Sequence, residues 1–137
     1  MKRIEAEQIA DLLNTQNQLT VPYTTEKVIE HQNDIIYHIG DDGKVICAVE
    51  VSRVQWYQAE IKHLTVDPGM KRKGLGRKLL AEAEEKALEL GALVVQCTVR
   101  DNNTGSIKLF LSSGYHHCLT VKNPKSGNRI MILQKPI

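Results

Sequence analysis

Basic residues crowd around two glycines in segment 71–78, which reads KRKGLGRK. A helix is expected to begin near Gly74, so these cations lie at the positive end of its dipole, while four glutamates follow between positions 82 and 89. The arrangement is unfavourable in itself, but it suits a helix whose N-terminus binds an anion. Gly74 and Gly76 let the backbone approach phosphate oxygens closely. The segment predicts a pyrophosphate-binding loop, with a solvated basic helix start as the alternative.

Two other phosphate-binding loops do not fit these residues. A Walker A loop needs Lys and then Ser or Thr directly after its second glycine, but Leu75 and Gly76 follow Gly74 here. The dinucleotide fingerprint G-x-G-x-x-G fails as well, because Arg-Lys-Leu follows Gly76 and no parallel βαβ unit with a ribose-binding acid surrounds it. An ATPase and a dinucleotide-dependent enzyme are therefore not expected.

The elements that must position this loop can be predicted from the spacing of apolar residues. Helical spacing predicts helices over 4–14, from Thr24 or Thr25 to about His31, over 74–90, and over 104–113. Strand-like runs lie at 35–40, 45–51, 59–66, 93–99, 115–121 and 128–134. Asp41-Asp42-Gly43-Lys44 has the composition of a hairpin turn, and Pro68 and Gly69 end the third strand. The order predicts one mixed α/β (α+β) domain over 1–137, with a single mostly antiparallel sheet flanked by helices.

The composition favours a small globular protein. The net charge is +2, from 18 basic and 16 acidic residues, which gives no overall reason to expect nucleic acid or a membrane as partner. No apolar run is long enough to span a bilayer, and the first residues lack the apolar stretch of a signal peptide. Three widely spaced cysteines favour thiols in a reducing compartment, so a cytoplasmic location is expected.

Two motifs resemble a known family. V-D-P-G-M-K-R-K-G-L-G-R-K-L-L (66–80) resembles the acetyl-coenzyme A signature of the GNAT N-acetyltransferases, Gln/Arg-x-x-Gly-x-Gly/Ala. Asn103-x-x-Ser106-x-x-Leu109-Phe110-x-x-x-Gly114-Tyr115 is similar to the family's second motif. The resemblance covers about residues 45–121. It implies a GNAT-like acyl-CoA N-acyltransferase fold and an enzyme that transfers the acetyl group of acetyl-CoA to a primary amine.

The resemblance also assigns the cofactor-binding residues. Backbone amides from Arg72 to Gly76, with Arg77 close by, would hold the pyrophosphate, and the backbone of Leu64, Thr65 and Val66 would pair with the pantetheine arm. Asn103 and Ser106 would border the arm in a slot where the sheet opens between 59–66 and 93–99. The implied set is Leu64, Thr65, Val66, Lys71, Arg72, Lys73, Gly74, Leu75, Gly76, Arg77, Asn103, Ser106 and Phe110.

The reaction implied is direct attack of a neutral amine on the thioester. Because an alkyl ammonium is mostly protonated at neutral pH, a base must take its proton. Glu60 is the first candidate, since it falls where the family's histone acetyltransferases carry a glutamate base, in a similar A-E-I context. His63 is the second, because the pKa of an imidazole lies near neutrality. The alternative for Glu60 is a solvated carboxylate at a strand edge.

The sequence departs from the family at Phe110. The usual general acid at this position is a tyrosine, and a phenyl ring has no proton to donate to the leaving thiolate. Tyr115 or solvent could substitute, but Tyr115 occupies a position that is usually a packed phenylalanine. A non-catalytic acetyl-CoA sensor is therefore a second hypothesis. A third is a small domain that binds nucleic acid through KRKGLGRK, which predicts salt-sensitive binding.

The acceptor is not named by the sequence. A small molecule, a peptide N-terminus and a lysine are all open, and Tyr23, Trp56 and Tyr57 could line the acceptor site or pack at the edge of the domain. His116, His117 and Cys118 are contiguous, so alternation in a strand points them to opposite faces, and no metal site is expected. Dimers are common in the family, so a homodimer is a possible assembly.

Overall fold

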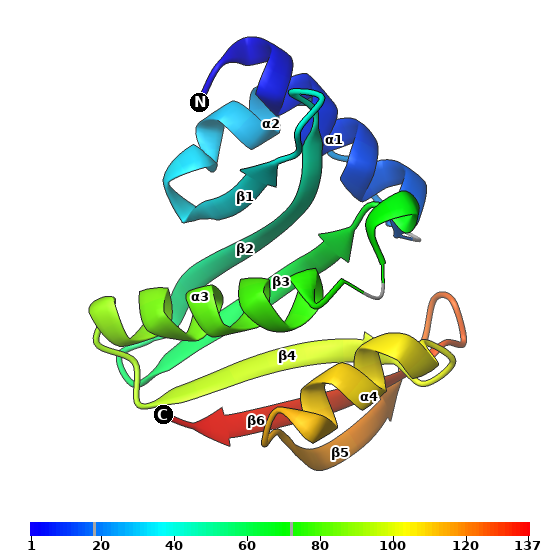
Figure 1. The fold of residues 1–137 in the computed structure, drawn as a ribbon. Coiled ribbons are helices and arrows are strands. Elements are labelled where there is room, and N and C mark those ends of the chain that lie inside the picture. Colours follow the sequence, from blue (N-terminus) through cyan, green and yellow to red (C-terminus); the bar gives the residue numbers. More distant parts are fainter. Residues whose placement is uncertain (18, 72) are drawn as a thin grey trace. The chain divides into compact units, whose positions relative to one another are not determined.

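The computed structural model describes residues 1–17, 19–71 and 73–137. Its α-helices are α1 (Arg3–Gln16), α2 (Thr25–Glu30), α3 (Leu75–Glu89) and α4 (Thr104–Ser112) (Figure 1). Two short 3-10 helices, η1 (Gln32–Asp34) and η2 (Pro68–Met70), connect them to strands. The strands are β1 (Ile35–Ile39), β2 (Val45–Gln55), β3 (Gln58–Val66), β4 (Val94–Arg100), β5 (His116–Lys122) and β6 (Arg129–Pro136).

The six strands form one sheet in the order β1-β2-β3-β4-β6-β5. β3 and β4 pair in parallel from Gln58↔Val94 to Ile61↔Cys97, and α3 lies between them in the chain. The glycine loop therefore does lie in a parallel βαβ unit, contrary to the expectation from the sequence. The pairs β1–β2, β4–β6 and β5–β6 are antiparallel. This mixed, mostly antiparallel sheet with its helices confirms the predicted fold class.

The chain divides into two compact units, and β2, β3 and α3 each contribute residues to both. Unit 1 comprises Met1–Val51 and His63–Ala83. In it, the apolar side of α1, with Ile9 and Leu13, packs in one buried cluster with Val28 of α2, Ile35 of β1 and Val45 of β2. The local sequence sets the start of α2, because the Thr24 side chain accepts a hydrogen bond from the Lys27 amide at 3.1 Å.

Unit 2 comprises Ser52–Lys62 and Glu84–Ile137. Ala59, Val95, Cys97 and Leu133 are buried and alternate with less buried neighbours along β3, β4 and β6, several of which are polar. Because successive side chains of a strand point to opposite faces, this alternation gives this part of the sheet one apolar face and one face that carries polar groups. The polar face holds Glu60.

The structure adds two features to the predicted elements. β2 continues to Gln55, and η2 follows β3, where the Asp67 side chain accepts a hydrogen bond from the Gly69 amide at 2.9 Å. The predicted hairpin turn is confirmed: Gly40 N donates to Lys44 O at 2.8 Å, and Gly43 has φ +82°. Within the described ranges, no helix is both long and apolar enough to cross a bilayer.

Candidate functional site

The predicted phosphate loop lies in unit 1, between η2 and the first turn of α3. Gly74 has φ +76°, a left-handed backbone that glycine adopts readily, and a Cβ built on it would meet nothing within 4 Å. The Lys78 amide donates to Gly74 O at 3.1 Å, which is the first hydrogen bond of the helix. The amides of Leu75 and Gly76 come before this bond, in the turn whose N–H groups have no acceptor within a helix. The loop therefore presents helix-end amides next to a backbone position open to a ligand, which fits an anionic pyrophosphate.

The cations of this loop face solvent. Lys71, Lys73 and Arg77 are exposed, and the first turn of α3 carries no acidic residue. Arg72, which belongs to the predicted set, lies outside the described residues. The positive side chains and the α3 dipole thus add in the same direction, as the binding of a phosphate group requires.

The end of β3, predicted to pair with the pantetheine arm, is irregular. His63 has φ +54°, which is uncommon for a residue with a side chain. Thr65 is buried, and its hydroxyl donates to His63 O at 2.7 Å and accepts from Asn17 Nδ2 at 2.9 Å. Because the Thr65 hydroxyl is used within unit 1, a ligand at this residue is expected to bind its backbone.

Glu60, the first candidate base, lies half-buried on β3 in unit 2. Its Oε2 accepts a hydrogen bond from Gln96 Nε2 of β4 at 3.3 Å. Burial raises the pKa of Glu60 above its ordinary value, while the positive charge of Lys62 and the bond from Gln96 act in the opposite direction. A carboxylate whose pKa is shifted towards neutrality is a better proton acceptor from an ammonium than a fully solvated one.

His63, the second candidate, belongs to unit 1. Its ring lies edge-on to Tyr23, with centroids 5.1 Å apart. The Tyr23 hydroxyl donates to Glu50 at 3.0 Å, and His31 Nδ1 lies 2.6 Å from the same carboxylate. Burial, followed by the Glu50 charge, raises the pKa of Tyr23.

Sequence reasoning missed Glu50, a carboxylate that is only 4% exposed. The signal was present as one acid inside the apolar run VICAVEV. Buried charges are rare unless they have partners, so a lone acid in such a strand indicates that polar side chains meet it. Its partners, Tyr23 and His31, come from the α1–α2 connection and the end of α2.

The second motif builds the start and the core of α4. Asn103 caps the helix, because its Oδ1 accepts from the Ser106 amide at 3.2 Å. Phe110 is 4% exposed and packs edge-on against Tyr115, with ring centroids 5.0 Å apart. The Tyr115 hydroxyl donates to Glu84 at 3.0 Å, and Lys135 Nζ contacts the same carboxylate at 3.0 Å. Tyr115 is therefore a packed core residue, as its position in the motif indicated.

Tyr115→Phe is expected to lower stability and to leave catalysis nearly unchanged. The variant loses a hydrogen bond to a largely buried carboxylate, which is worth about 1.5–3 kcal/mol, or several degrees in Tm for a domain of this size. Thermal unfolding and steady-state rates check this, with Tyr57→Phe at a position 37% exposed as control. An unchanged Tm with a rate lowered more than about tenfold would instead make Tyr115 the proton donor.

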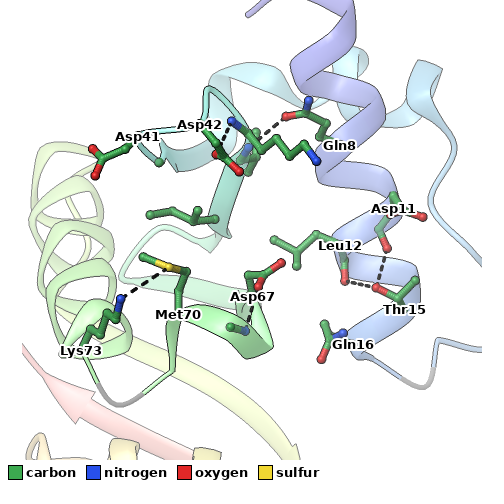
Figure 2. Close-up of a pocket in the computed structure, with 15 residues that line it drawn as sticks. Gln8, Asp11, Leu12, Thr15, Gln16, Asp41, Asp42, Asp67, Met70 and Lys73 are labelled. Atoms are coloured by element: carbon green, nitrogen blue, oxygen red, sulfur yellow. Dashed lines mark hydrogen bonds between the residues drawn. The ribbon is translucent and has the colours of Figure 1, made fainter.

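A cavity of about 500 Å³ in unit 1 lies between α1, the β1–β2 turn and η2 (Figure 2). Lys44 and Lys73 line it, but so do four carboxylates, those of Asp11, Asp41, Asp42 and Asp67. A pyrophosphate would face four carboxylates there, so this cavity does not suit the cofactor's phosphates. Over the same described ranges, no group of three or more His, Cys, Asp or Glu side chains is arranged to hold a metal ion.

The three aromatic residues that were candidates to line the acceptor site are divided between the two units. Tyr23 is buried in unit 1, whereas Trp56 and Tyr57 lie at the β2–β3 turn of unit 2, with Trp56 70% exposed. The two rings of the turn contact each other edge-on at 5.2 Å. Tyr23 is thus tied to Glu50, while Trp56 is available at the surface.

Comparison with known proteins matches this arrangement to a family. The profile of the acetyltransferase (GNAT) family matches residues 2–115. The chain is 25% identical over 104 residues to ribosomal protein bS18-alanine N-acetyltransferase of Escherichia coli (strain K12), covering 74% of this chain and 70% of that protein.

Solved structures share the fold. Ard1 from Thermoplasma volcanium superposes with a TM-score of 0.85 at 19% identity, over 100% of this chain and 94% of that one. YncA from Salmonella typhimurium, solved with its cofactor acetyl-CoA, has a TM-score of 0.81 at 19% identity, over 99% and 90%. Because the profile spans most of the sequence and agrees with both motifs, the chain belongs to the acetyltransferase (GNAT) family and is an acyltransferase with acetyl-CoA as its co-substrate.

Proposed function

We propose that the protein transfers the acetyl group of acetyl-CoA to a primary amine by direct attack, with Glu60 as the base. The amine nitrogen forms a bond to the acetyl carbon as the bond from that carbon to sulfur breaks, and Glu60 takes the proton that the ammonium must lose. The observation that carries this proposal is the half-buried Glu60 carboxylate, whose pKa burial raises. The base is needed because the free amine is a minor species at neutral pH.

The acceptor is proposed to be the α-amine of a peptide or protein. The support is the relative that acetylates an alanine of a ribosomal protein, which matches 74% of this chain. An α-amine also has a lower pKa than a lysine side chain, so less driving force is needed to deprotonate it. A lysine or a small amine would require the same base and is tested in the same screen.

Within unit 1, the cofactor site is proposed to use the backbone of Leu64–Val66 and the loop 71–77. The roles of Asn103, Ser106 and Phe110, which belong to unit 2, stay predictions from the family resemblance. The left-handed, unobstructed Gly74 and the amides at the start of α3 support phosphate binding by the loop. The Thr65 hydroxyl is already hydrogen-bonded within unit 1, which supports a contact between the pantetheine arm and the backbone of this residue. Since Phe110 has no proton to give, the leaving thiolate takes one from water. A single domain over 1–137, a homodimer and a cytoplasmic location stay predictions.

Acetyl-CoA at about a hundred times Kd is expected to stabilise the protein by about 2.7 kcal/mol, which raises Tm by several degrees. NAD and ATP, which carry pyrophosphate without the pantetheine arm, should produce smaller shifts. A thermal scan with the three ligands measures this. Equal shifts for all three would indicate a general polyphosphate site, and no shift at saturating acetyl-CoA would overturn the cofactor site.

A panel of amines then separates the function classes. Release of CoA thiol on addition of a peptide with a free N-terminus supports the proposed reaction, whereas a thermal shift without turnover on any amine indicates a sensor. Binding of RNA or DNA that weakens steeply with salt, without an acetyl-CoA effect, would favour the basic-loop alternative.

A further inference from the structure

Three polar side chains form a row across the polar face of unit 2. Glu60 of β3 is the register partner of Gln96 of β4, and Gln96 is the register partner of Gln134 of β6. Residues directly opposite each other in a sheet point to the same face. Two hydrogen bonds join the row: Gln134 Nε2 donates to Gln96 Oε1 at 2.7 Å, and Gln96 Nε2 donates to Glu60 Oε2 at 3.3 Å.

The two bonds of the row fit one orientation of the Gln96 amide, with its oxygen towards Gln134 and its nitrogen towards Glu60. A glutamine amide has an acceptor oxygen and a donor nitrogen of nearly equal size, so either could face the carboxylate. Because the Gln96 oxygen already accepts from Gln134, its NH₂ group faces Glu60. If the amide turned around, its oxygen would repel ionised Glu60 and would accept a hydrogen bond only from the neutral acid, which would favour the protonated form.

We propose that Gln96 and Gln134 are positioning residues for Glu60. Gln96 holds Oε2, so that Oε1 is the oxygen that takes the proton from the acceptor ammonium, and Gln134 fixes the amide of Gln96. Together they keep Glu60 ionised despite its burial. This inference rests on the proposed role of Glu60 as the base.

The groups near Glu60 differ in kind and in the face they occupy. Lys62 on the same strand lowers the pKa of Glu60 by its charge. Cys97 of β4 lies on the opposite, apolar face, and burial, followed by the Glu60 charge, raises the pKa of its thiol to about 12. His116 of β5 is the register partner of Gln134 and lies beyond it in the row. Replacing the glutamines with neutral residues changes none of these charges.

The matched test uses Gln96→Met and Gln134→Met, which keep the side-chain length and remove the hydrogen bonds. Gln96→Met is expected to move the acidic limb of the kcat/KM profile to higher pH, with about tenfold lower kcat/KM on that limb, the value of a hydrogen bond to a charged group. Gln134→Met, which acts through Gln96, is expected to lower it about fivefold. At high pH, where Glu60 is ionised in every variant, kcat should change less than about twofold, and the KM for acetyl-CoA should stay the same.

The double variant is the decisive measurement. If Gln134 acts only through Gln96, Gln134→Met has no further effect once Gln96 is methionine, so the pH profile of the double variant matches that of Gln96→Met. If the effects of the two single substitutions on the pH profile instead add in the double variant, Gln134 does not act through Gln96 and the proposal is overturned. Thr98→Val, on the same face of β4 and exposed, is the control and should leave the profile unchanged.

A second readout does not depend on activity. A carbon NMR titration of the Glu60 carboxyl, assigned by comparison with Glu60→Gln, should show its pKa raised in both methionine variants. If Glu60→Gln keeps full activity, the proposed base is wrong, yet the titration still tests the row. An unmoved Glu60 pKa in Gln96→Met would overturn the inference itself, whatever the rates show.

Discussion

Glu60→Gln is expected to lower kcat about a hundredfold to ten-thousandfold, the usual contribution of a general base. The amide has the shape of the carboxyl group and still accepts the hydrogen bond from Gln96, so the loss belongs to the proton acceptor rather than to the packing. The acetyl-CoA thermal shift should be unchanged, because the residue takes no part in the proposed cofactor site. Initial rates of CoA release with the best amine of the screen measure the effect.

Although Glu60→Gln is expected to lower kcat, it is not expected to lower the stability of the fold. Burial raises the pKa of Glu60, so the folded protein favours its neutral form, and ionisation of Glu60 lowers stability as pH rises from the ordinary pKa of about 4 through the raised one. A glutamine does not ionise. Glu60→Gln should therefore have a Tm at or above that of the unchanged protein at pH 8, with the difference smaller near pH 4.

His63→Asn is the matched comparison for the second candidate base. Asparagine tolerates the left-handed backbone that His63 adopts with φ +54°, so the change removes the imidazole with little backbone strain. We expect kcat of His63→Asn to stay within about threefold of that of the unchanged protein, a much smaller change than the loss of a general base causes. A strong loss in His63→Asn together with full activity in Glu60→Gln would reverse the assignment.

The sequence was sufficient to predict elements whose causes are local. The 3.6-residue spacing of α3, the Thr24 cap of α2 and the glycines of the turns each act within a few residues, and the structure reproduces the corresponding elements. The family resemblance also depends on short motifs, which place Gly74 at the start of α3 and Asn103 at the cap of α4. These features need no knowledge of which strands are neighbours.

The polar row could not be predicted because it depends on register. Glu60 and Gln96 are 36 residues apart in the sequence, and Gln96 and Gln134 are 38 residues apart. A shift of one residue in the pairing of either pair of strands would place the two paired side chains on opposite faces of the sheet. The partners of Glu50 are hidden for the same reason, since Tyr23 precedes it by 27 residues. Only the isolated acid in an apolar strand was visible beforehand.

The reaction needs the candidate base, Glu60, more than it needs the general acid that is missing at Phe110. Phe110 and Tyr115 pack together, and the Tyr115 hydroxyl is bound to Glu84, so this part of unit 2 stabilises the fold instead of supplying a proton. A thiolate is a fair leaving group, since a thiol such as cysteine has a pKa of about 8.5, whereas a neutral amine is required for attack. The rate should therefore depend more on Glu60 than on any donor to sulfur.

Gly74→Val is expected to weaken acetyl-CoA binding about tenfold or more, the cost of one lost hydrogen bond to a charged group. A β-branched residue at φ +76° is strained by about 1–2 kcal/mol, so the loop turns away from the geometry that presents the Leu75 and Gly76 amides. The space around the residue is open, with nothing within 4 Å of an added Cβ, so steric overlap in unit 1 does not cause the effect. Titration of the thermal shift with acetyl-CoA gives the change in Kd.

Gly43→Val supplies the matched control within the same unit. Gly43 has φ +82° and equally open surroundings, but it lies in the β1–β2 turn rather than at the start of a helix. Both variants should lose a similar number of degrees in the absence of ligand, because the same backbone strain is imposed on each. Only Gly74→Val should lose affinity for acetyl-CoA. An equal loss in both variants would mean that general destabilisation is being measured, and full affinity in Gly74→Val would show that the phosphates bind elsewhere.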